Sequence, residues 1–177
     1  MRTLLKALPP DLDAALVVAQ HRGPESHPTA FRSLLGAVTR LNVCDADDKQ
    51  PLERGYAYLA PPDYHLLVEG SHLALSVESP VAFSRPSIDV LLESAAEEYR
   101  SRCVGVVLTG ANDDGARGLA RIRELGGAAV VQDPATAERP EMPRAALRAV
   151  PDAHVLPLEL IAPLLVELCG TTKPATT

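Results

Sequence analysis

The sequence has little of the chemistry that would tie it to metals or membranes. Its three cysteines, Cys44, Cys103 and Cys169, are far apart and form no Cys-x-x-Cys pair. This spacing favours reduced thiols over a disulfide framework or a zinc site. No apolar run approaches the roughly 20 residues that cross a bilayer, and the N-terminus lacks a charged-then-apolar leader. We therefore expect a cytoplasmic chain that does not insert into the membrane and holds no metal or other cofactor.

Positive charge is also scarce. The chain has 17 Lys and Arg against 23 Asp and Glu, a formal net charge of −6. Such a balance gives no electrostatic attraction for phosphate backbones, so no nucleic-acid partner is expected. The glycine patterns of nucleotide sites, GxGxxG and the P-loop, are missing as well. A nucleotide-binding domain is therefore a weak alternative.

What is present fits one globular domain of alternating strands and helices. The 177 residues are 46% hydrophobic, enough to bury a core. Apolar runs predict strands over 14–20, 56–61, 103–110, 128–133 and 153–157, and a hairpin over 64–78. Helical patterns cover 29–38, 85–102, 114–125, 141–150 and 158–170, the last interrupted by Pro163. This order predicts a doubly wound α/β fold, a mostly parallel sheet with helices on both faces and an inserted antiparallel hairpin.

Two strand-end loops carry titratable side chains, His21 in one and Asp113 and Asp114 in the other. Open α/β sheets place their sites at the carboxyl ends of strands. An aspartate before a helix can simply cap it, and a lone histidine can simply bond a backbone group. Together, however, a carboxylate can orient a histidine ring to take a proton from a nucleophile. The residues alone leave both interpretations open.

Five segments, in order and spacing, resemble the catalytic domain of the CheB family of chemotaxis protein-glutamate methylesterases. These segments are LVVAQHRGP, YAYLAPPDYH, SRPSIDVLLESAA, VVLTGANDDGARGL and VVQDPATAERPEMPRAAL. The resemblance implies one domain over residues 1–170, and the polar composition of residues 171–177 predicts a disordered tail. It also implies hydrolysis of glutamyl methyl esters on methyl-accepting chemotaxis receptors by a Ser-His-Asp mechanism, with glutamine deamidation as a second activity of the family.

The resemblance assigns roles to particular residues. The family's histidine falls on His21, and its aspartate falls on Asp114 rather than Asp113. Backbone amides near Gly110 and Ala111 become candidates for oxyanion stabilisation. Arg144, in the EMPRAAL segment, either contacts substrate carboxylates or stabilises local structure, and these two roles remain equal alternatives.

The chain departs from the family at the nucleophile. The family carries its serine in a Ser-[Ala/Thr]-Gly-Gly turn after the first strand, whereas this chain opens with MRTLLKALP, which resembles the helix that follows the turn. We expect that strand and serine to lie ahead of Met1, and without them two inner strand edges should be unpaired. Ser26 and Ser87 are poor substitutes, expected in a loop and in the first turn of a helix.

The missing nucleophile affects what can be expected of the function. Whether this chain is itself an enzyme stays open, because a catalytically inactive relative that binds receptors or signalling partners is the alternative. A second departure is Ala111-Asn112, where many members have methionine and glycine after Thr-Gly. This change alters the side chains that line the expected site.

Overall fold

The structure is a computed structural model that describes residues 1–21 and 28–171. Its parallel strands form two three-stranded sheets, in the orders β1-β3-β2 and β6-β7-β8. The strands of the first sheet are β1 (Leu16–Val18), β2 (Asn42–Asp45) and β3 (Tyr56–Leu59). Those of the second are β6 (Val104–Val107), β7 (Ala128–Gln132) and β8 (His154–Leu156). An antiparallel pair, β4 (His65–Glu69) and β5 (His72–Ser76), forms the predicted hairpin.

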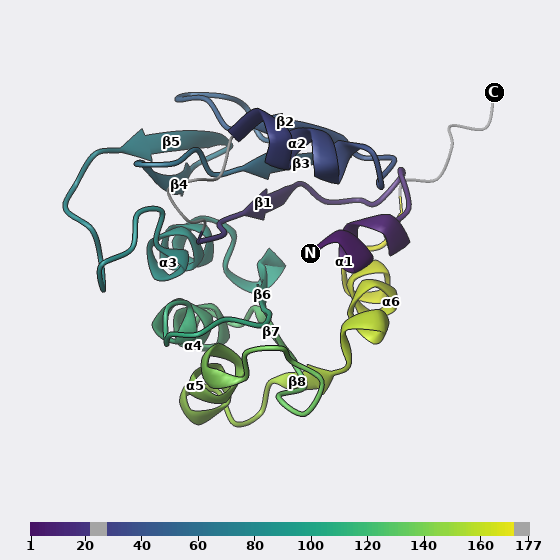
Figure 1. The fold of residues 1–177 in the computed structure, drawn as a ribbon, viewed down its shortest axis with the longest axis vertical. Coiled ribbons are helices and arrows are strands. Elements are labelled where there is room, and N and C mark those ends of the chain that lie inside the picture. Colours follow the sequence, from purple (N-terminus) through teal and green to yellow (C-terminus); the bar gives the residue numbers. More distant parts are fainter. Residues whose placement is uncertain (22–27, 172–177) are drawn as a thin grey trace.

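Helices cover both faces of these strands (Figure 1). The helices are α1 (Arg2–Ala7), α2 (Pro28–Gly36), α3 (Ile88–Tyr99), α4 (Ala116–Glu124), α5 (Glu141–Ala149) and α6 (Leu158–Cys169), with a short 3-10 turn at Arg100–Arg102. In Figure 1, α3, α4 and α5 lie on one side of β6 and β7, while α1 and α6 lie on the other. The predicted doubly wound α/β class is confirmed.

Alternating side chains explain why both faces are covered. In β7, Val130 packs into the core that contains α1 and α6, whereas Ala129 and Val131 pack toward α4 and α5. Successive strand residues point to opposite faces, so a strand that is apolar throughout needs cover on both. In β3, Leu59 and Tyr58 divide between two cores in the same way.

Among the described residues, the two parallel sheets share no paired strand. Within the described residues, β1 pairs only with β3, and β6 pairs only with β7. Val104 and Val106 of β6 are half-buried rather than buried, and they pack with Leu16 of β1 against one core. An apolar strand with one free edge remains open to pairing with another extended segment.

Three local expectations need correction. Helix α6 runs through Pro163 without interruption. Pro163 has no N–H to donate to the carbonyl of Glu159, but that residue is exposed, so water can satisfy it. Helix α3 begins at Ile88, with Ser87 as its N-cap rather than inside its first turn. Strand β2 was not predicted, because its segment is short and partly polar.

The C-terminal end of the described chain pairs with the segment that follows α1. Of the tail predicted to be disordered, residues 172–177 lie outside the described residues, while Thr171 forms an isolated bridge with Leu12. In the described part of the chain, no helix is long and apolar enough to cross a bilayer.

Candidate active site

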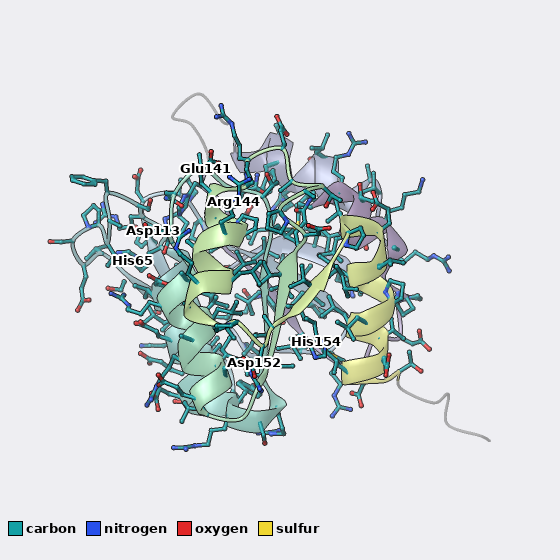
Figure 2. The ribbon with its side chains drawn as sticks, turned by 90° about the horizontal axis from the view of Figure 1, so that it is seen from below. His65, Asp113, Glu141, Arg144, Asp152 and His154 are labelled. Carbon is teal, nitrogen blue, oxygen red and sulfur yellow. The ribbon has the colours of Figure 1, made fainter. Side chains whose placement is uncertain are left out.

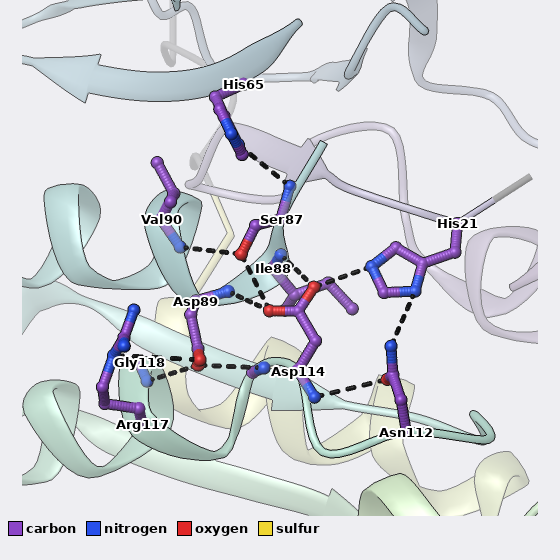
Figure 3. A network of polar contacts seen from close by, with 11 residues as sticks. His21, His65, Ser87, Ile88, Asp89, Val90, Asn112, Asp114, Arg117 and Gly118 are labelled. Carbon is purple, nitrogen blue, oxygen red and sulfur yellow. Dashed lines mark hydrogen bonds and ion pairs between the residues drawn. The ribbon is translucent and has the colours of Figure 1, made fainter. Parts of the chain in front are cut away.

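His21 and Asp114 meet at the carboxyl ends of two strands that belong to different sheets (Figure 3). His21 follows β1, and Asp114 ends the turn between β6 and α4. The ring nitrogen Nε2 of His21 lies 2.7 Å from Oδ2 of Asp114, although 93 positions separate the two residues. The side chain of Asp114 is fully buried, and that of His21 is 30% exposed. A buried carboxylate thus holds a partly accessible imidazole.

Asp114 accepts four hydrogen bonds. Its Oδ2 accepts from His21 Nε2 and from the backbone N–H of Ile88 at 2.7 Å. Its Oδ1 accepts from the Ser87 hydroxyl at 2.8 Å and from the backbone N–H of Asp89 at 2.9 Å. Burial acts to raise the pKa of Asp114, but these hydrogen bonds together hold it below its ordinary value. The carboxylate is therefore ionised at neutral pH.

The expected capping role is real, but it serves a different helix. Asp114 bonds the first amides of α3, not those of α4, which it precedes in the chain. The N-terminus of α4 is capped instead by Asp89, whose Oδ1 accepts from Gly115 at 2.9 Å and from Gly118 at 2.8 Å. Capping and orientation of His21 are thus two roles of one carboxylate.

The turn itself requires glycine directly after Asp114. Gly115 has φ +96°, in the left-handed region, and a Cβ there would lie 2.7 Å from Cγ2 of Ile88. Only glycine combines that backbone with that close approach. The turn therefore brings the Asp114 carboxylate against the start of α3.

The second ring nitrogen of His21 faces an amide. Nδ1 lies 3.3 Å from Nδ2 of Asn112, and Oδ1 of Asn112 accepts the backbone N–H of Asp114 at 3.3 Å. Asn112 was noted in the sequence only as a departure from the family pattern.

Ser87 and His65 are site neighbours whose contacts the sequence did not predict. Ser87 is completely buried, and its hydroxyl donates to Asp114 and accepts from Val90 N–H at 3.4 Å. The Ser87 hydroxyl therefore bonds the Asp114 carboxylate and not the His21 ring, which argues against Ser87 as a nucleophile. His65 of β4 accepts the Ser87 backbone N–H at Nδ1, at 3.2 Å, and so ties the hairpin to the start of α3. A serine-x-aspartate pair at a helix start is a capping signal, but it does not reveal these partners.

The remaining predicted site residues have varied placements. The Gly110 amide already donates to the carbonyl of Arg139 at 3.0 Å, while Ala111 is exposed in the same turn. Arg144 is exposed in the first turn of α5. Figure 2 shows Arg144 and Asp113 toward the same end of the molecule. Ser26 lies outside the described residues.

The cysteines of the described chain are unpaired and poorly suited to act as nucleophiles. All three are free thiols. Burial, with a smaller contribution from Cys169, raises the pKa of the Cys103 thiol to about 11, so it stays protonated at neutral pH. Burial also raises the pKa of Cys44 and that of Cys169. Over the same described residues, no three His, Cys, Asp or Glu side chains gather as metal ligands.

The sequence and the fold resemble one family of known proteins. A family model described as CheB methylesterase matches residues 1–165. A protein of Leptospira interrogans, provisionally named protein-glutamate methylesterase/protein-glutamine glutaminase, is 46% identical over 169 residues, which span 95% of this chain and 87% of that protein. A protein-glutamate methylesterase/protein-glutamine glutaminase of Geobacter metallireducens is 37% identical over 174 residues, or 96% of this chain.

The chain spans 48% of the Geobacter protein, about half its length. Among solved structures, the crystal structure of the Thermotoga maritima CheB methylesterase catalytic domain superposes with a TM-score of 0.90 at 29% identity. That superposition covers 94% of this chain and 90% of the other. Family model, relatives and structure agree over nearly the whole chain, and this protein belongs to the CheB methylesterase family.

Proposed function

We propose that this chain carries the proton acceptor and the orienting carboxylate of a protein-glutamate methylesterase. Its substrates would be glutamyl methyl esters on chemotaxis receptors, in the cytoplasm. The observation that carries the proposal is the 2.7 Å contact between His21 and the buried, ionised Asp114. A histidine held by a carboxylate in this way can take the proton of a nucleophile.

The reaction proceeds in two halves. The His21 imidazole takes the proton of a serine hydroxyl, and the resulting alkoxide attacks the ester carbonyl. Methanol leaves with a proton returned by the imidazolium, and water then hydrolyses the acyl-enzyme to free the glutamate side chain. Asp114 holds the ring in place and stabilises the imidazolium formed in each half.

We propose that the nucleophile is a serine in a Ser-x-Gly-Gly turn of the kind typical of the family. Of the residues that the structure describes, no serine hydroxyl bonds His21, and the nearest candidate, Ser87, is committed to Asp114. The mechanism therefore requires a nucleophile other than a described serine, and the edges of β1 and β6 that are unpaired among the described residues are where a strand carrying it would fit.

Two further groups have supporting roles in the proposal. The Gly110 amide is occupied by Arg139, so the Ala111 amide is the better oxyanion donor of the two. Each such donor typically contributes about 3–4 kcal/mol to transition-state stabilisation. Arg144 either attracts acidic side chains of the substrate or only supports α5, and its exposure is compatible with both.

The test measures methanol release from a methylated receptor fragment by a chain extended ahead of Met1 with a family-type strand and Ser-x-Gly-Gly turn. We expect turnover by the extended chain, loss of turnover in its His21→Ala variant, and none by the chain as printed. The matched control is Asp113→Asn, because Asp113 is exposed in the same turn. Full activity of the His21→Ala variant would refute the role of the ring. Receptor binding without any turnover would favour the inactive binding protein instead.

A further inference from the structure

The contacts around His21 determine which ring nitrogen carries the proton. Asp114 is ionised and has only acceptor atoms, so the nitrogen that faces it, Nε2, must donate. A neutral imidazole has one N–H, which leaves Nδ1 as an acceptor with a free lone pair. The contact with Asp114 thus places the ring proton of His21 on Nε2.

Asn112 gives the same assignment from the opposite side of the ring. Its side-chain oxygen accepts the backbone N–H of Asp114, which orients the amide and turns Nδ2 toward the ring. Nδ2 has only hydrogens to offer, so it donates to Nδ1 of His21. A flipped amide would set its NH₂ group against the Asp114 N–H and its oxygen against the Nδ1 lone pair. Two independent partners therefore select one tautomer.

We propose that Asn112 is a positioning residue that holds His21 in the Nε2–H tautomer and reserves Nδ1 as the nitrogen that takes the nucleophile's proton. In the common serine-hydrolase arrangement the aspartate bonds Nδ1 and the nucleophile faces Nε2, so the ring is used here in the opposite sense. The Asn112 bond is 3.3 Å, longer than the usual 2.9–3.0 Å of such bonds, so an incoming hydroxyl can replace it. The catalytic meaning rests on the proposed esterase function, whereas the tautomer is a property of the folded chain.

The tautomer can be measured on the chain as printed, without any activity. Nitrogen-15 NMR of the imidazole distinguishes a bare ring nitrogen from a protonated one, and a His21→Gln variant identifies the His21 signals. We expect, above the titration of the ring, a protonated Nε2 and a bare Nδ1. A protonated Nδ1 with a bare Nε2 would overturn the proposal, whether or not the protein proves to be an esterase.

The role of Asn112 is tested with Asn112→Asp, which keeps the acceptor for the Asp114 N–H but replaces the donor to Nδ1 with a negative oxygen. The ring then faces carboxylates at both nitrogens, so we expect Nδ1 to be protonated as well as Nε2 under conditions in which Nδ1 of the unsubstituted chain is bare. Asp113→Asn is the control, because it also changes the charge of this turn by one but does not contact the ring. An Asn112→Asp ring whose Nδ1 stays bare under those conditions would refute the proposal.

A second variant covers the case in which Asn112→Asp fails to fold. Asn112→Gly removes the amide altogether and restores the family's common residue. With its hydrogen bond gone, the Nδ1 resonance should move further toward that of a free, bare nitrogen while Nε2 stays protonated. An unmoved Nδ1 resonance would show that Asn112 does not contact the ring.

Discussion

Asp114 and Asp89 cap each other's helices. Asp114 accepts the backbone N–H groups of Ile88 and Asp89 at the start of α3, and Asp89 accepts those of Gly115 and Gly118 at the start of α4. The two carboxylates thereby fix the two helix starts against one another, as Figure 3 shows. Because Asp114 also orients His21, the same side chain serves the stability of the fold and the chemistry of the site.

Asp114→Asn should therefore lower both stability and activity. Each oxygen of Asp114 accepts one backbone N–H, so either orientation of an asparagine amide sets its NH₂ group against a buried donor. We expect the free energy of unfolding to fall by about 2–4 kcal/mol. In the extended chain, loss of ring orientation should reduce kcat/KM for methanol release by about 10³–10⁴-fold.

Urea unfolding and the esterase assay measure these two effects separately. Asp113→Asn is again the matched control, expected to change stability by less than about 0.5 kcal/mol because its side chain is exposed. An Asp114→Asn chain as stable as the control would contradict the mutual capping.

Acid should destabilise the fold through Asp114. The hydrogen bonds lower its pKa in the folded chain from the ordinary 3.8, so its ionised form favours folding. That contribution is complete above the unfolded value and is lost as the pH falls below 3.8 through the lower folded pKa. Urea midpoints should drop in this range for the unsubstituted chain and drop less for Asp114→Asn.

The pKa of Asp89 is shifted in the opposite direction to that of Asp114, so Asp89 should affect the pH dependence of stability in the opposite way. Burial, together with the nearby Asp114 charge, raises the pKa of Asp89 from 3.8, so its ionised form opposes folding. Its contribution favours folding below the unfolded value and is lost as the pH rises through the folded pKa. In the unsubstituted chain, ionisation of Asp89 should lower the free energy of unfolding just above pH 3.8, and Asp89→Asn should remove this loss. If the free energy of unfolding depended on pH in the same way in Asp89→Asn and Asp114→Asn, these assignments would be contradicted.

Gly118→Ala should push α4 away from α3. A Cβ at Gly118 would lie 2.6 Å from Cβ of Leu92 and 2.9 Å from the carbonyl oxygen of Asp89, and the backbone cannot move without disturbing the cap. We expect a loss of about 1–3 kcal/mol in the free energy of unfolding. Gly36→Ala in α2 is the control, since a Cβ there would meet only Cβ of Val43 at 4.0 Å, and it should be neutral or stabilising. Equal effects of the two substitutions would show that α3 and α4 are not closely packed at Gly118.

Hydrogen exchange should reveal the two inner edges. In the part of the chain that the structure describes, strands β3 and β7 are paired on both sides, whereas β1 and β6 are paired on one. We expect the amides of β1 and β6 to exchange at rates like those of the outer strands β2 and β8, and faster than those of β3 and β7. Protection of β1 and β6 equal to that of β3 and β7 would mean that the inner edges are covered.

The sequence predicted the elements better than the contacts. Strand β7 and helix α5 were placed to within a residue or two, because alternation and capping are local signals. Strand β2 was missed because its residues show no clear strand pattern, and it is pairing with β3 that makes the segment a strand. Pro163 was given too much weight, since the carbonyl that it leaves unpaired lies on an exposed residue.

The sequence by itself determined the α/β class, the hairpin and the two loops that carry His21 and Asp114, since each depends on residues close in the chain. Only the tertiary structure decided that these two side chains meet, that Asp114 caps α3 rather than α4, and that Ser87 faces the carboxylate. Those outcomes depend on how α3 packs against α4 and the strand ends, which joins residues separated by 25 to 93 positions. Periodicity and local capping preferences extend over one or two turns, so they hold no information about such pairs.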